Sequence, residues 1–262
     1  MPTKPTLANA NITNSYAKID WKNGQPFSTV FDDVYFNSDD GLAETHHVFI
    51  QNNHLVQRFQ HLKNACFTII ETGFGTGLNF LSTWKTWREH APADVLKNST
   101  LHFISCEKYP VTQQDLATSL QLFPSLNDLS EQLIEQYAPL KNSQTMIFEQ
   151  GNITLTLLIG DATEQLAMLQ AKADAWFLDG FSPSKNPDMW SDALFMQMAA
   201  LSTHQSTLAT FTSAGMVKRG LKAAGFTVHK CSGFGKKREM LIGIFNGDIN
   251  LLSTTATATH HE

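Results

Sequence analysis

The sequence has few of the residues that indicate a secreted, membrane-bound or metal-binding protein. Its 262 residues include only 3 cysteines, Cys66, Cys106 and Cys231, which lie far apart in apolar surroundings. This spacing fits neither a disulfide framework nor a zinc site, so we expect free thiols and no bound metal. No segment is long and apolar enough to span a membrane, and the N-terminus lacks the apolar segment of a secretory signal. We therefore expect a cytoplasmic protein with no membrane partner.

Charged residues are also scarce, at 16% of the chain. The 19 basic residues against 24 acids give a net charge of −5, which argues against a protein covered in nucleic-acid-binding surface. Residues 216–240 depart from this balance, because basic residues there far outnumber the single acid. These basic residues are Lys218, Arg219, Lys222, Lys230, Lys236, Lys237 and Arg238. The cluster fits either docking to one polyanion or an ordinary solvated surface.

From residue 66 onward, short apolar segments alternate with segments of helical periodicity. Alternation of this kind predicts a parallel sheet wrapped by helices. The last two expected strands are joined by a short loop without a helix, which predicts an antiparallel hairpin. The fold class is therefore α/β, with a mostly parallel seven-stranded sheet that ends in a C-terminal hairpin. The expected strands span residues 66–71, 101–107, 153–160, 173–179, 206–212, 226–231 and 239–245, and the expected helices 77–90, 111–121, 162–170, 187–201 and 214–224.

The chain divides into three regions. Residues 1–60 form an N-terminal extension, whose first ten or so residues have the composition of a disordered segment. The aromatic residues that follow are expected to pack on the sheet and to form part of a substrate mouth, and a capped helix is expected near Asp40. Residues 61–247 form the main domain, with an inserted helix expected within 122–150. Residues 248–262 are expected to be a disordered tail.

The glycine-rich loop after the first strand of the main domain is the most informative segment. Residues 71–77 read Glu-Thr-Gly-Phe-Gly-Thr-Gly, after an apolar segment and before a helical one. Glycines let the backbone approach a ligand closely, and a helix N-terminus favours an anionic group. The spacing differs from the dinucleotide pattern Gly-x-Gly-x-x-Gly, which disfavours a nicotinamide dehydrogenase, and no Gly-Lys-Ser/Thr follows. An ordinary strand-to-helix turn is the alternative.

Acidic residues stand where three further expected strands end. Glu107, Asp161 and Asp179 each follow an apolar segment, and open α/β sheets bind ligands at the carboxyl ends of their strands. A carboxylate at Glu107 can accept hydrogen bonds from both hydroxyls of a ribose. The alternative roles are local: Glu107 could pair with Lys108, Asp161 could cap the next helix, and Asp179 could start a turn.

An acid followed by Gly-x-Gly-x-Gly resembles motif I of the S-adenosylmethionine-dependent methyltransferases, whose class I (Rossmann-like) fold matches the predicted sheet. The resemblance implies S-adenosylmethionine as cofactor. In that family the adenine amino group is recognised at the position of Asp161, and the acid at the end of the fourth strand, here Asp179, faces the methyl group.

Asp179-Gly180-Phe181-Ser182-Pro183 departs from the Asp/Asn-Pro-Pro-aromatic motif of enzymes that methylate amines, but it keeps the acid and an aromatic residue. An amine must be neutral to attack a methyl group, and it becomes cationic as the methyl arrives. A carboxylate can orient the amine and stabilise that charge. Asp179 and Phe181 are therefore the expected catalytic residues, with Phe181 able to stack on a flipped base. The alternative is that Phe181 belongs to the core.

Longer segments resemble the methyltransferase module of the MnmC/MnmD family in order and spacing, from about Tyr16 to Phe245. They are Tyr35-Phe36-Asn37, Gly41-Leu42-x-Glu44-Thr45, Glu71-x-Gly73-Phe74-Gly75-Thr76-Gly77-Leu78-Asn79-Phe80, Trp176-Phe177-Leu178-Asp179-Gly180-Phe181-x-Pro183, Lys185-Asn186-Pro187-Asp188-Met189-Trp190, Thr210-Phe211-Thr212-Ser213-Ala214-Gly215 and Gly233-Phe234-Gly235-x-Lys237-Arg238-Glu239-Met240.

This resemblance implies methylation of 5-aminomethyl-2-thiouridine, or its unthiolated form, at the wobble position of tRNA, giving 5-methylaminomethyl-2-thiouridine. It implies a tRNA partner and, in many members, an FAD-dependent oxidoreductase on the same or a separate chain. Whether the present chain is a stand-alone enzyme or part of a fusion is left open. On the resemblance, Glu71, Gly73, Gly75 and Gly77 hold the methionine part of the cofactor, Glu107 the ribose and Asp161 the adenine.

Charge adds a candidate nucleic-acid surface, made of Lys218, Arg219, Lys236, Lys237 and Arg238. Two other functions stay open at this point. One is a methyltransferase that acts on a small-molecule amine, and the other is a noncatalytic tRNA-binding module.

Overall fold

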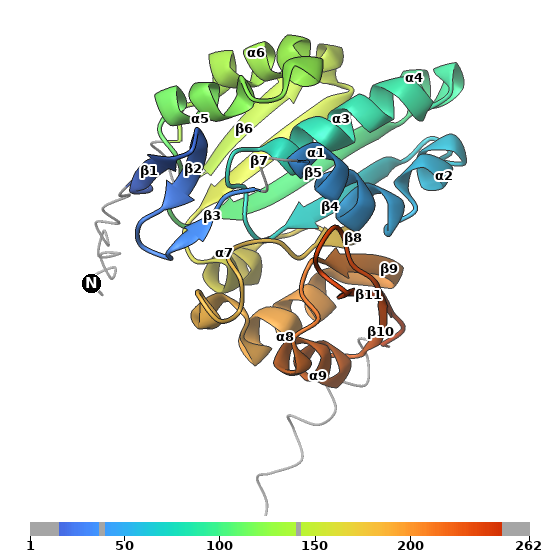
Figure 1. The fold of residues 1–262 in the computed structure, drawn as a ribbon. Coiled ribbons are helices and arrows are strands. Elements are labelled where there is room, and N and C mark those ends of the chain that lie inside the picture. The colour runs from blue at the N-terminus through green and yellow to red at the C-terminus, as the bar shows by residue number, and fades with distance from the viewer. Residues whose placement is uncertain (1–15, 37–39, 140–142, 248–262) are drawn as a thin grey trace, which may run out of the picture.

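The computed structural model of the protein describes residues 16–36, 40–139 and 143–247. Within these residues an eight-stranded sheet forms the centre of the molecule, and a smaller antiparallel sheet lies to one side (Figure 1). The strands of the large sheet are β4 (Cys66–Glu71), β5 (Thr100–Glu107), β6 (Ser143–Phe148), β7 (Ile153–Ile159), β8 (Ala173–Phe177), β9 (Ser202–Thr210), β10 (Phe226–Ser232) and β11 (Glu239–Phe245).

The order of the large sheet is β10-β11-β9-β8-β4-β5-β7-β6. Its strands β9, β8, β4, β5 and β7 are parallel to their neighbours in this series, and β11 runs antiparallel between β9 and β10. The mostly parallel sheet and its C-terminal hairpin are thus confirmed. The number of strands is eight rather than seven, because β6 adds an antiparallel strand beside β7 at the edge. The inserted helix expected within residues 122–150 is present as α6 (Asn127–Gln136), but β6 follows it in the same segment.

Helices cover both faces of the large sheet (Figure 1). Helix α3 contacts α1, α2 and α6, whereas α8 contacts α7 and α9 in a separate group. The remaining helix bounds are α1 (Gly41–Thr45), α2 (Leu55–Gln60), α3 (Leu78–His90), α4 (Ala93–Asn98), α5 (Gln113–Leu120), α7 (Ala162–Met168), α8 (Asp192–Leu201) and α9 (Gly215–Ala223), with a π-helical segment His46–Gln51 and short 3₁₀ turns Pro124–Leu126, Glu149–Gly151 and Pro187–Met189.

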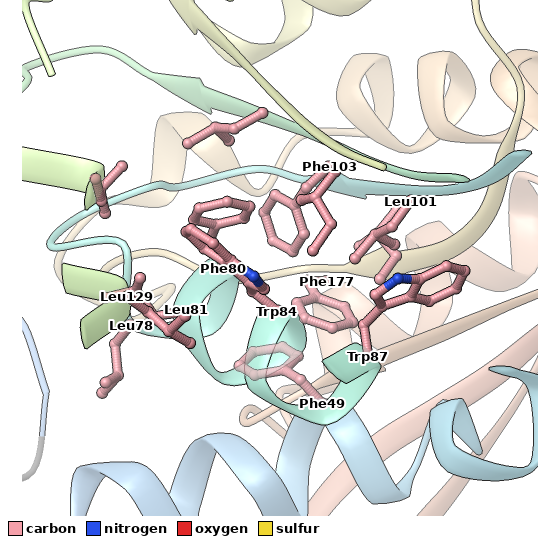
Figure 2. Close-up of a cluster of buried hydrophobic side chains, with 14 of the residues drawn as sticks. Phe49, Leu78, Phe80, Leu81, Trp84, Trp87, Leu101, Phe103, Leu129 and Phe177 are labelled. Carbon is pink, nitrogen blue, oxygen red and sulfur yellow. The ribbon is translucent and has the colours of Figure 1, made fainter. Parts of the chain in front are cut away.

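Two hydrophobic clusters lie on opposite faces of the sheet. Successive side chains of a strand point to opposite faces, so Ile69 belongs to one cluster and Ile70 to the other. The first cluster is rich in aromatic residues, and Figure 2 shows Trp84 and Trp87 of α3 in the same cluster as Phe103 and Phe177 of the sheet. All four are fully buried, which fixes α3 and the loop that precedes it against the strands.

The N-terminal extension packs against the same face. Its strands β1 (Ile19–Lys22), β2 (Gln25–Ser28) and β3 (Asp33–Val34) form the small sheet. Asp32 pairs with Lys185 at 2.5 Å, and Asp33 accepts a hydrogen bond from the Ser182 backbone at 3.2 Å. These contacts hold the turn between β2 and β3 against the loop that follows β8.

Helix α1 begins at Gly41, and the Asp40 side chain caps it by accepting from the Ala43 backbone, as expected. The disorder expected for the first ten or so residues and for 248–262 falls outside the described residues. None of the helices in the described part of the chain has the length and hydropathy needed to cross a membrane.

Candidate active site

A cavity of about 260 Å³ opens at the carboxyl ends of β4, β5, β7 and β8. Among the residues predicted for the site, Gly73, Gly75, Glu107, Asp161, Asp179 and Phe181 line this cavity. The extension supplies another wall through Phe31, Val34 and Tyr35. Most of the predicted strand-end residues and the aromatic extension therefore meet at one place, as the topology of a parallel sheet requires.

The glycine loop brings the backbone of residues 73–77 to the cavity. A Cβ atom at Gly73 would lie 3.1 Å from the Asp179 carbonyl oxygen, so this position accommodates little more than hydrogen. Gly77 has φ +73° and lies directly before the first residue of α3. A side chain there would be strained, and its Cβ would lie 2.8 Å from the Phe74 ring. Gly77 therefore shapes the loop and is not among the residues that line the cavity.

Glu107 stands at the end of β5 and is held by backbone groups. Its carboxylate accepts from Gly75 N at 2.9 Å and from Tyr109 N at 2.8 Å. Burial raises the pKa of Glu107 to about 7, against the opposing effect of these hydrogen bonds. Each carboxylate oxygen still has acceptor capacity for a ligand donor.

Asp161 follows β7 and serves α7 as its N-cap. Its side chain accepts from Thr163 N at 3.0 Å, and it also pairs with Lys108 at 3.2 Å. The local capping role considered for this residue is therefore present. The residue also lines the cavity, so the carboxylate is available to a ligand at the same time.

Asp179 lies directly after the extended segment that continues β8. Its carboxylate accepts from Gly180 N at 2.8 Å and from the side-chain amide of Asn79 at 2.7 Å. The Thr72 hydroxyl donates to the Asp179 carbonyl oxygen at 2.7 Å and fixes its backbone against the glycine loop. Burial raises the pKa of Asp179 to about 6, while Asn79 and Lys237 act in the opposite direction. Two donors thus direct the carboxyl group of Asp179.

Phe181 lies between the extension and the loop after β8. Its ring stacks on Phe31, with centroids 4.6 Å apart, and meets the edge of Tyr35 at 5.2 Å. The Trp190 indole donates to the Phe181 carbonyl oxygen at 2.9 Å. One face of the Phe181 ring is thus covered by the protein's own Phe31.

Glu71 differs from the other acids, because it is fully buried and is not among the residues that line the cavity. It accepts from the Asn79 amide at 2.7 Å and from the Ser105 hydroxyl at 2.6 Å. Burial, together with the nearby Asp179, holds the pKa of Glu71 well above its usual value. Glu71 is connected to the cavity through its hydrogen bond from Asn79, which lines the cavity.

The predicted basic residues occupy two elements. Lys218 and Arg219 lie in the first half of α9, whereas Lys236, Lys237 and Arg238 lie in the loop that joins β10 to β11. Lys237 pairs with Glu44 at 2.8 Å, and its ammonium group lies 4.5 Å from the centroid of the Phe211 ring. Lys236 and Arg238 are exposed.

Sequence reasoning missed the residues that orient the acids, namely Asn79, Thr72 and Thr45. Asn79 lies in the Gly-Leu-Asn-Phe part of residues 71–80, the segment that resembles the MnmC/MnmD family. That resemblance is the sequence feature that could have indicated a role for Asn79. Its role could not be deduced because its partners come from other elements. In the described part of the chain, no group of three or more His, Cys, Asp or Glu residues has the geometry of a metal site.

A family model described as S-adenosyl-L-methionine-dependent methyltransferase matches residues 124–246. The tRNA 5-methylaminomethyl-2-thiouridine biosynthesis bifunctional protein MnmC of Methylobacillus flagellatus is 53% identical over 232 residues, which cover 88% of this chain and 35% of that protein. The protein of the same name from Ectopseudomonas mendocina is 51% identical over 235 residues, with the same two coverages. The chain is thus similar to one part of these MnmC proteins, and residues 124–246 match the S-adenosyl-L-methionine-dependent methyltransferase family.

The chain thus spans about a third of the length of these MnmC relatives. A solved structure, MnmC2 from Aquifex aeolicus, matches with a TM-score of 0.68 at 21% identity, and the match covers 94% of this chain and 77% of that one. At this identity the likeness supports the fold alone, and it agrees with the class I methyltransferase architecture expected from the sequence.

Proposed function

We propose that this chain transfers a methyl group from S-adenosylmethionine to the primary amine of 5-aminomethyl-2-thiouridine, or its unthiolated form, at the wobble position of tRNA. The product is 5-methylaminomethyl-2-thiouridine. The observation that carries the proposal is the Asp179 carboxylate, which lines the same cavity as Glu107 and the glycine loop. The names of the half-identical MnmC relatives support the choice of tRNA and of this uridine.

The cavity has groups that suit the cofactor. Glu107 can accept from the ribose hydroxyls and Asp161 from the adenine amino group, while Gly73 and Gly75 bring the loop backbone to the cavity, where it can contact the methionine part. Glu71 and Gly77 do not line the cavity. Glu71 accepts a hydrogen bond from Asn79, and Gly77 adopts the positive φ that the loop needs before α3. When bound, S-adenosylmethionine supplies an electrophilic methyl group on a cationic sulfur.

Asp179 acts on the amine that receives the methyl group. As a carboxylate it accepts a hydrogen bond from the neutral amine and directs its lone pair at the methyl carbon. As the carbon–nitrogen bond forms, the nitrogen becomes cationic, and the nearby negative charge stabilises it. Phe181 and its aromatic neighbours form an apolar wall for the uracil ring beside this carboxylate.

The tRNA would meet the basic residues of α9 and of the β10–β11 loop, among which Lys236 and Arg238 are exposed. The relatives are named bifunctional, and they extend well beyond the length matched here. We therefore infer that an FAD-dependent oxidoreductase, on the same or a separate chain, prepares the amine that this module methylates.

Methyl transfer to defined tRNA tests the proposal. The wild-type chain is mixed with methyl-labelled S-adenosylmethionine and tRNA that carries the 5-aminomethyl nucleoside, and the nucleosides are then separated after digestion. Label is expected in 5-methylaminomethyl-2-thiouridine. Asp179→Asn is expected to lower turnover about 100-fold, because the negative charge at the amine is lost, while affinity for S-adenosylhomocysteine stays within about three-fold.

The matched control is Asp94→Asn, a carboxylate on α4 that precedes β5 and so lies at the opposite edge of the sheet from the cavity. It is expected to keep wild-type turnover. Absence of label in tRNA from the wild-type chain would contradict the proposal, and label in a free small amine instead would favour the small-molecule alternative. Equal loss of cofactor affinity and turnover in Asp179→Asn would assign Asp179 to cofactor binding.

A further inference from the structure

Asn79 lies in the first turn of α3 and joins two of the acids. Its side-chain nitrogen donates to Glu71 and to Asp179, both at 2.7 Å. Its side-chain oxygen accepts from the Thr45 hydroxyl at 2.9 Å. Asn79 is 7% exposed and lines the cavity, so nearly all of its hydrogen-bonding capacity is used inside the protein.

This arrangement permits one orientation of the amide. An asparagine amide has two N–H donors, and here each one faces a different carboxylate. A flipped amide would direct its oxygen at both carboxylates and its nitrogen at Thr45, leaving two buried acids without this donor. Buried carboxylates without donors are costly, so Thr45 and the two acids together fix the side chain.

The arrangement also connects three parts of the molecule. Glu71 belongs to β4, Asp179 follows β8, and Thr45 ends α1 in the N-terminal extension. The position of the Asp179 carboxylate thus depends on α3, the helix after the glycine loop, and on how α1 of the extension packs against it.

We propose that Asn79 is a positioning residue for methyl transfer, which directs the Asp179 carboxylate at the substrate amine and keeps it ionised. This inference rests on the proposed function. The amide acts through Asp179: Gly180 N and the Asn79 amide each donate to one carboxylate oxygen, and the remaining lone pairs can accept from the amine.

The charged groups around Asp179 come from several elements. Glu44 of α1 favours its protonated form, and Lys237 of the β10–β11 loop favours the carboxylate. Asp179 in turn raises the pKa of the buried Glu71 of β4. Glu44 and Lys237 also pair with each other. Asn79 adds a neutral donor that stabilises the carboxylate without adding a countercharge. Its loss is therefore expected to raise the pKa of Asp179.

Three variants test the proposal. Asn79→Leu keeps much of the volume and removes both donors, Asn79→Asp adds a third acid to the group, and Thr45→Val removes only the hydroxyl that orients the amide. The matched control is Thr83→Val, one turn further along α3, where a fully buried hydroxyl donates only to the Asn79 backbone carbonyl. Each variant is first checked for folding by thermal melting with S-adenosylhomocysteine.

Turnover with tRNA is expected to fall about 10- to 100-fold in Asn79→Leu and Asn79→Asp, because a hydrogen bond to a charged group is lost. The decrease in Thr45→Val should be smaller. The acid limb of the pH profile of turnover should move to higher pH by about one unit. The affinity of the three test variants for S-adenosylhomocysteine should stay within about three-fold of wild type. The turnover of the control Thr83→Val should stay within the same limit.

Carbon-13 NMR of the Asp179 carboxyl group, titrated with pH in the free protein, gives a second readout that needs no activity. An unchanged titration in folded Asn79→Leu and an unchanged acid limb in Asn79→Asp would each overturn the proposal. If the wild-type chain transfers no methyl group but the titration moves as expected, the proposed function fails while the positioning of Asp179 by Asn79 stands.

Discussion

At the scale of single residues, the acids of the site differ in what surrounds them. Glu107 is held by backbone donors, Asp179 by a backbone and an amide donor, and Glu71 is buried behind both. Burial raises the pKa of each of them. A ligand that donates to these carboxylates must therefore compete with a proton near neutral pH.

Glu107 leads to a prediction about cofactor binding. Ribose hydroxyls donate to the ionised carboxylate, so binding favours deprotonation of a group whose pKa in the free protein is about 7. Below that pH, affinity for S-adenosylhomocysteine should fall by up to about ten-fold per pH unit, with release of a proton on binding. Calorimetry at several pH values, in buffers of different ionisation enthalpy, measures both quantities.

Glu107→Gln provides the control for this prediction. It should bind more weakly at neutral pH and lose most of the pH dependence, because the amide does not titrate. An affinity of the wild-type chain that stays constant across this range would exclude Glu107 as the ribose acceptor. For folding the sign is the reverse: the raised pKa implies that Glu107 lowers the stability of the free protein as pH rises from about 4.5 to about 7.

The placement of acids at strand ends could be predicted from the sequence, because a strand followed by an acid can be read from one segment, although Glu71 lies outside the cavity that the other acids line. Asn79 could not be predicted in the same way. Its donors meet Glu71 only eight residues away but Asp179 at a separation of 100 residues. A hydrogen bond between distant segments depends on the packing of α3 on the sheet, and no local pattern in a single sequence specifies that.

At the scale of elements, most strands and helices of the main domain lie where periodicity predicted them. Two exceptions are the short helix α4 (Ala93–Asn98), which was not expected, and β6, in residues 143–148, which follows α6 within a segment expected to be helical. Its sequence Ser-Gln-Thr-Met-Ile-Phe buries only Met146 and Phe148, and Ile147 is 58% exposed. An edge strand that buries one face over six residues leaves a weak apolar signal beside a strong helical one.

The loop between β10 and β11 gives a prediction about tRNA. Lys237 is already paired with Glu44, so the exposed Lys236 and Arg238 are the better candidates for phosphate contact. The double variant Lys236→Glu with Arg238→Glu should weaken tRNA binding about ten-fold or more at low salt. It should also reduce the salt slope by about one for each lost phosphate contact. Filter binding over a range of salt concentrations measures both.

A control variant with the same change in charge distinguishes the effect of lost phosphate contacts on tRNA binding from the effect of the protein's net charge. Lys63 and Lys97 are exposed just before β4 and β5, at the edge of the sheet opposite the cavity. Lys63→Glu with Lys97→Glu should leave the salt slope near the wild-type value. Equal effects of the two double variants would mean that the β10–β11 loop makes no specific contact with tRNA.

At the scale of the whole molecule, the extension and the sheet together enclose the site. The large sheet places the strand ends side by side, and the extension adds Phe31, Val34 and Tyr35 as a further wall. The Asp32–Lys185 pair connects the extension to the loop after β8, and the Thr45–Asn79 hydrogen bond connects it to α3. The sequence predicted that the aromatic residues of the extension pack on the core, but it did not predict the small sheet, whose strands have two to four residues.

Acids at the ends of β5, β7 and β8 line one pocket, which we propose binds a sulfonium nucleoside, while Glu71 at the end of β4 is fully buried. A crystal structure of the chain with S-adenosylhomocysteine is the decisive measurement. We expect the ribose hydroxyls on Glu107, the adenine amino group at Asp161 and the sulfur directed at the space beside Asp179. A nucleoside bound elsewhere, or a sulfur directed away from Asp179, would refute this assignment.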